Sequence, residues 1–159
     1  MGAAVSDDMS TYDLDSFATA RAFIDAIVWG EHVRVWALLG PSAREHVLRS
    51  ANRKGMDAVA AERARQGTWS AEESDQFLSS LVRGLRVDLS GVDLDQIHVV
   101  NDPETQADGC VRYRLESTTL LPVELTGGAH WAAGAVHLSL QDSVWRVLRL
   151  EPRLPAGPP

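Results

Sequence analysis

Residues 29–45, WGEHVRVWALLGPSARE, decide how the first half of this chain folds, because a helical apolar pattern is broken twice within them. Gly30 can adopt the left-handed conformation that ends a helix, and Gly40-Pro41 forms a second break. Between the breaks, apolar residues recur at three-residue steps, which predicts a short helix. Two such turns let consecutive helices change direction and wrap around something that must come later in the chain.

Helical periodicity continues on both sides of this stretch. Apolar residues from Leu14 to Val28 recur at three- and four-residue steps, which predicts an amphipathic helix. Ser42-Ala-Arg-Glu45 and Ser70-Ala-Glu-Glu73 match the capping box, so further helices are expected from Ser42 and from Ser70 to about Leu85. Residues 56–66 can form an exposed helix. Residues 85–94 fit either an extended connector or an additional edge strand.

From about residue 95 the pattern changes to the two-residue alternation of β-strands. Strands are predicted at 97–100, 110–120, 130–140 and 144–150. Consecutive strands with short links favour an antiparallel sheet, and the amphipathic helices must cover its apolar face. The sequence therefore predicts the α+β class.

Length and composition indicate one globular domain over residues 13–153, with disordered ends at 1–12 and 154–159. The chain has 159 residues, of which 45% are hydrophobic and 23% charged. No apolar run approaches the roughly 20 residues that span a bilayer, and no secretory leader is apparent. The single cysteine, Cys110, fits a reducing compartment, so a cytoplasmic protein is expected. Fourteen of the 15 basic residues are arginine, a bias typical of GC-rich bacteria such as actinobacteria.

The charge and the motif content argue against several functions. A net charge of −7 opposes nucleic-acid binding, and the arginine-rich run 44–65 is interleaved with acidic residues and carries no aromatic residue for base stacking. The five histidines have no short ligand spacing, so no metal is expected. No nucleotide-binding motif is present, so no cofactor is expected either.

Two stretches resemble the NTF2-like superfamily, whose members include ketosteroid isomerase and SnoaL-like cyclases. Residues 23–45, FIDAIVWGEHVRVWALLGPSARE, are similar to the first three helices of many small bacterial members. Residues 136–152, VHLSLQDSVWRVLRLEP, look like their closing hairpin. The resemblance implies helices packed on the concave face of a curved antiparallel sheet, a cone with an apolar pocket, and often a homodimer. The helical stretch 42–85 departs from it, since many relatives have a strand or a shorter insertion there.

Two polar residues are candidates for chemistry on the inward face of the strands. Tyr113 shares a face with Val111 and Leu115, so its hydroxyl is either a pocket donor or bonded within the core. His130 falls on the inward face at a strand start, where a side chain with an unperturbed pKa near 6.5 can act as acid or base, or else faces solvent.

Four tryptophans and one histidine complete the candidate sites. Trp29, Trp36 and Trp145 are expected to line the core or a ligand pocket. Trp131 and His137 fall on the outer face of the sheet, where they favour a dimer contact.

The expected function is binding of a small hydrophobic molecule, or a non-catalytic accessory role, because no carboxylate falls on the inward face of the predicted strands. One alternative is a SnoaL-like enzyme (a cyclase, isomerase, dehydratase or epoxide hydrolase) that uses Tyr113 and His130. Another alternative is a dimeric protein-interaction module. The fold by itself does not choose among them.

Overall fold

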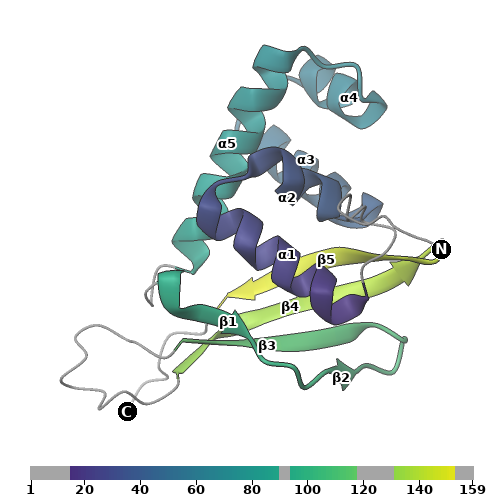
Figure 1. The fold of residues 1–159 in the computed structure, drawn as a ribbon. Helices are drawn as coiled ribbons and strands as arrows, with labels where there is room; N and C mark the ends of the chain where they lie inside the picture. Colours follow the sequence, from purple (N-terminus) through teal and green to yellow (C-terminus); the bar gives the residue numbers. More distant parts are fainter. Residues whose placement is uncertain (1–14, 90–93, 118–130, 153–159) are drawn as a thin grey trace, which may run out of the picture.

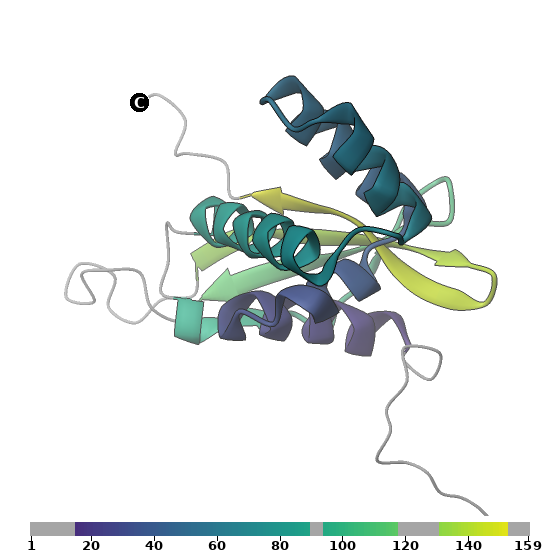
Figure 2. The same ribbon diagram turned by 90° about the horizontal axis from the view of Figure 1, so that it is seen from above.

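The computed structural model describes residues 15–89, 94–117 and 131–152, and over these residues the chain has the predicted α+β architecture. The helices are α1 Ser16–Trp29, α2 His32–Leu38, α3 Pro41–Arg53, α4 Ala58–Gln66 and α5 Ala71–Asp88. The strands are β1 Ile97–Val99, β2 Glu104–Thr105, β3 Val111–Ser117, β4 Trp131–Gln141 and β5 Val144–Pro152. The helices lie on one face of the curved sheet (Figures 1 and 2). The ends predicted to be disordered lie outside the described residues.

The first break in the deciding stretch ends α1. Gly30 has φ of 73°, in the left-handed region, and its N–H donates to the carbonyl of Ile27. At the other end of α1, the Asp15 carboxylate accepts the Ala18 N–H at 2.7 Å. The predicted boundary at Gly30 is confirmed.

The second break lies against the sheet. The Gly40 N–H donates to the Val147 carbonyl at 2.9 Å, and Leu39 forms a parallel bridge with Val147. Pro41 is the first residue of α3, where its fixed φ suits the first turn of a helix. The capping box predicted at Ser42 is therefore wrong: Ser42 is already inside the helix, and Gly40 occupies the cap position without a side-chain bond.

Helix α5 begins as predicted and runs further than predicted. Ser70 and Glu73 form a complete capping box. The helix continues to Asp88, so the expectation of a connector or strand is wrong for residues 85–88. Leu85 and the buried Leu89 continue the helical spacing of Val82, which decides in favour of the helix. Residues 90–93 lie outside the described part of the chain.

The sheet is antiparallel, with strand order β1-β3-β4-β5 and the short β2 paired with β3. Its register shifts between Leu115 and Glu116 on β3, and between His137 and Leu138 on β4. Such irregularities bend strands and increase their twist, in keeping with the curvature of this sheet. The two-residue β2 was not predicted, because its sequence carries no alternation.

A packed core fills the space between α1, α2 and the sheet. Its fully buried side chains include Phe23, Ile24 and Ile27 of α1, Leu38 of α2, and Leu115, Val136 and Leu138 of the sheet. The strand residues are those on the predicted inward face. None of the described helices is long and apolar enough to cross a membrane.

Candidate functional site

The largest groove lies among the helices rather than between helices and sheet. It encloses about 820 Å³ between α3 and α5 and is open to solvent. A second hollow of about 290 Å³ adjoins it between α4 and α5. The two share Met56, Gln76, Phe77 and Ser80, so they form one continuous depression, here called the helical groove. Helix α4 and the first turns of α5 stand farthest from the sheet (Figure 1).

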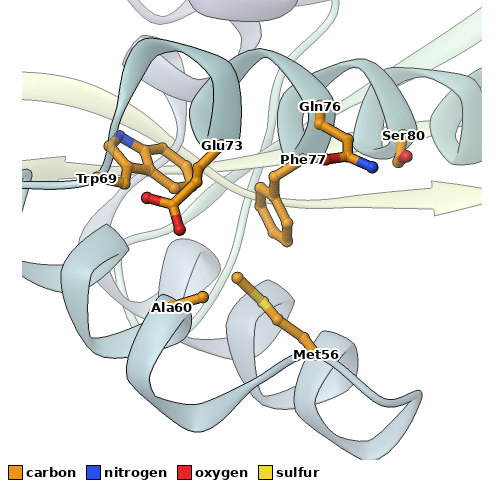
Figure 3. Close-up of a pocket in the computed structure, with 7 residues that line it drawn as sticks. All are labelled: Met56, Ala60, Trp69, Glu73, Gln76, Phe77 and Ser80. Carbon is orange, nitrogen blue, oxygen red and sulfur yellow. The ribbon is translucent and has the colours of Figure 1, made fainter.

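The floor of the helical groove is apolar. Phe77 on α5 and Met56, between α3 and α4, point toward each other across it (Figure 3). Leu81 and Leu85 extend the apolar surface along α5, one turn and two turns beyond Phe77.

Helix α4 leaves the groove open because its sequence, AVAAERARQ, offers small side chains. Ala60 lines the hollow, and Ala61 and Ala64 are buried. Val59, the largest aliphatic residue of this helix, is 59% exposed and does not line the groove. No side chain of α4 therefore fills the space in front of Phe77.

An aromatic cluster closes one end of the groove. The ring centroids of Trp36, Trp69 and Phe77 lie 5.6–5.8 Å apart, and Trp36 meets Phe77 edge to face. These separations are typical of favourable aromatic pairs. Sequence patterns did not single out Trp69, because it lies outside any periodic segment, just before the cap residue of α5.

Ion pairs hold α4 against its neighbours. Arg63 of α4 donates from Nε to the Glu73 carboxylate of α5 at 3.2 Å, and Arg65 donates from Nε to Glu45 of α3 at 2.8 Å. The bond from Arg63, followed by the Ser70 N–H, lowers the pKa of Glu73 to about 2. Glu73, which lines the hollow, is therefore ionised at neutral pH.

The candidate Tyr113 lies in the core. It is 3% exposed, and its hydroxyl lies 2.7 Å from the Ser16 hydroxyl of α1. Its ring also meets Phe17 at 5.7 Å. The core alternative considered for Tyr113 matches this position, although the partner is a side-chain hydroxyl. His130 lies outside the described residues, so the pairing of Tyr113 with His130 stays a prediction.

The three tryptophans expected to line a core or pocket lie in different environments. Trp29 is 78% exposed at the end of α1, so its expected place in the core is wrong: it points away from the sheet side that Ile27 faces. Trp36 and Trp145 are partly buried against the core. Of the two, Trp36 reaches the groove through the aromatic cluster, and Trp145 is not part of the groove lining.

The outer face of the sheet carries a polar network. His137 is 8% exposed, and its Nε2 lies 2.7 Å from the Glu151 carboxylate. Arg112 donates to Glu151 at 3.2 Å and to Glu104 at 3.0 Å. The bonds from Arg112 and then from His137 lower the pKa of Glu151 to about 2. His137 thus pairs within its own chain, and of Trp131 only its place at the start of β4 is described.

Within residues 15–89, 94–117 and 131–152, no three His, Cys, Asp or Glu side chains are grouped so that they could hold a metal ion. The chain matches no protein-family model, no curated protein and no solved structure. Its resemblance to the NTF2-like superfamily stays a prediction.

Proposed function

We propose that this protein binds a small, mainly apolar molecule in the helical groove and does not transform it. The observation that carries the proposal is the continuity of the two hollows over an apolar floor of Met56, Phe77 and Leu81. This keeps the ligand class expected from the sequence and moves the site from the interior of the cone to the helices.

The size and chemistry of the groove support a small-molecule ligand. Pockets for such ligands typically measure roughly 300–1,000 Å³ and combine an apolar lining with a few polar groups. The helical groove falls in this range and adds the polar Gln76, Ser80 and His46 to its lining. A bound apolar molecule would remove the floor from water, which is the favourable step in such binding.

The polar lining favours binding over catalysis. Glu73 is the carboxylate nearest the aromatic end, and Arg63 holds its pKa at about 2. A general base works best when its pKa is near the operating pH, so a carboxylate with this pKa is a weak one. Its bonds to Arg63 and to the Ser70 N–H give it a structural role instead.

Fluorescence titration with N-phenyl-1-naphthylamine, a neutral apolar probe, tests the proposal. Ser80→Trp places a large side chain in both hollows from an exposed position on α5. We expect it to weaken probe binding by about tenfold or more, a change of about 1.4 kcal/mol in binding free energy.

Val87→Trp is the matched control, because Val87 lies on the same helix, is 64% exposed and does not line the groove. This variant should bind the probe like the unaltered protein. Equal affinity of the Ser80→Trp variant and the unaltered protein, or equal losses in the two variants, would rule out the groove as the binding site.

We also propose a homodimer formed through the outer face of the sheet, at Trp131 and His137. The described helices all cover the opposite face, which leaves the outer face available (Figure 2). Sedimentation velocity across a hundredfold range of protein concentration tests it. A sedimentation coefficient of a monomer throughout that range would contradict the dimer.

A further inference from the structure

Two arginines from distant parts of the chain meet at the end of α2. Arg146 of β5 donates from Nη1 to the Ala37 carbonyl at 2.7 Å. Arg44 of α3 donates from Nε to the Trp36 carbonyl at 3.1 Å, and its Nη2 lies 3.5 Å from the same Ala37 oxygen. The two guanidinium groups therefore share one acceptor.

The second break in the deciding stretch brings them together. Gly40 is buried, and its bond to Val147 fixes the turn between α2 and α3 on β5. A Cβ at Gly40 would lie 3.1 Å from the Arg146 Cβ and 3.3 Å from the Gln141 amide. A glycine here allows this close approach, which places Arg146 and Gln141 beside the first turn of α3.

The positive charge of this pair is not balanced by a carboxylate. Arg63, Arg65 and Arg112 each form an ion pair. Arg44 and Arg146 form none with any described residue; their described partners are carbonyls.

Both side chains of the pair are partly buried, where water screens their repulsion less. Burial and then the neighbouring Arg146 lower the pKa of Arg44. Partly buried like charges side by side are costly unless an opposite charge joins them.

We propose that Arg44 and Arg146 bind a dianionic oxyanion of the phosphate class. A guanidinium group presents five N–H donors in a rigid planar fork that matches the oxygens of phosphate. The described bonds occupy only part of the donors of each fork. A phosphate carries between one and two negative charges near pH 7, so one group can offset most of the charge of the pair.

The proposed oxyanion site borders the aromatic end of the helical groove. The Arg44 guanidinium lies 5.2 Å from the Trp36 ring centroid, and that ring also packs against Trp69 and Phe77. This contact orients Arg44 through a cation–π interaction. The oxyanion site stands on its own, because inorganic phosphate needs no apolar groove.

Titration with inorganic phosphate, followed by NMR of the arginine Nε–Hε signals of the full chain, tests the proposal. Sodium chloride at matched ionic strength serves as the reference salt. We expect saturable shifts of the Arg44 and Arg146 signals with phosphate and not with chloride. Arg44→Gln and Arg146→Gln should each weaken phosphate binding by about tenfold or more, since charge-assisted bonds are the strong ones.

Arg149→Gln is the matched control, because Arg149 lies on β5, is exposed and pairs with no described carboxylate. It should bind phosphate like the unaltered protein. The proposal is overturned if phosphate and chloride shift the signals alike in the unaltered protein, whatever the variants do. It is also overturned if Arg149→Gln weakens binding as much as Arg44→Gln does in folded protein.

Discussion

At the scale of single residues, Gly40 has the most demanding surroundings among the described glycines. Its backbone is extended, so no unusual conformation requires glycine; the requirement is the contact with Arg146 and Gln141. We expect Gly40→Ala to lower the free energy of unfolding by about 1–3 kcal/mol, the usual cost of overpacking. Urea denaturation measures it.

Gly84→Ala serves as the opposite case. Gly84 is exposed within α5, and a Cβ there would meet no atom within 4 Å. Alanine should therefore raise the free energy of unfolding by about 1 kcal/mol, the difference in helix propensity. A Gly40→Ala protein as stable as the Gly84→Ala protein would contradict the close docking of the turn between α2 and α3.

Tyr113 is stabilised by its hydroxyl bond as well as by its buried ring. Tyr113→Phe removes the bond to Ser16 while keeping the ring, so we expect a loss of about 1 kcal/mol in unfolding free energy. Ser16→Ala should cost a similar amount, and the double variant should cost less than the two together. Strictly additive losses would show that the hydroxyls do not interact in solution.

Sequence reasoning identified which residues face inward better than it identified their partners. Alternation along β3 correctly placed Tyr113 with the core, because the side-chain period of a strand is two. It could not indicate Ser16, which comes from the first turn of α1. Trp29 was misplaced because it lies at the last position of its helix, where the apolar face no longer has a sheet beneath it.

At the scale of elements, helix starts provide a direct comparison of two similar sequences. Ser70 caps α5 through the Glu73 N–H, whereas Ser42 lies inside α3. Ser70→Ala should lower the free energy of unfolding by about 1 kcal/mol, the usual cost of losing an N-cap. Ser42→Ala should change it by about 0.5 kcal/mol or less, as at ordinary surface sites. Thermal and urea unfolding of both variants measure the difference, and equal losses would contradict the assigned cap of α3.

Element boundaries were predictable where a single residue decides them, as at Gly30 and Ser70. They were not predictable where two periods overlap. In residues 85–89, Val87 and Leu89 fit a strand step, and Leu85 and Leu89 fit a helix step. Packing decided between them: Leu89 is buried and Val87 is exposed, which is the helical outcome.

At the scale of the whole molecule, the outer polar network links strands β2, β3, β4 and β5 and makes stability depend on pH. The pKa of Glu151 is about 2 in the folded protein, against about 4.3 in an unfolded chain. Its contribution to stability is therefore complete above about pH 4.3 and is lost as the pH falls toward 2. Glu151→Gln lacks this contribution.

The difference in unfolding free energy between the unaltered protein and the Glu151→Gln variant should be largest near pH 7 and shrink below about pH 4. Urea denaturation from pH 7 to pH 2.5 measures it. The exposed Glu31, which makes no cap bond at the start of α2, provides the control: Glu31→Gln should give a small difference at all pH values. A constant difference for Glu151→Gln across this range would contradict the network.

The overall architecture was predictable, and the groove was not. Helical periods followed by strand alternation led to the α+β class and to the inward face of the sheet. The walls of the groove depend on how α3, α4 and α5 are spaced, and the contacts between Arg63 and Glu73 and between Arg65 and Glu45 join residues that no period relates. Such contacts between elements leave no local pattern.

The turn between α2 and α3 also bears on aggregation. Strand β5 is the last strand of the sheet, and an unpaired strand edge is a template onto which another chain can add. Leu39 and Gly40 occupy part of that edge, since they bond to Val147 as an added strand would. The break that redirects the helices thus also shields the sheet edge from a neighbouring molecule, and its loosening would expose the edge before the core unfolds.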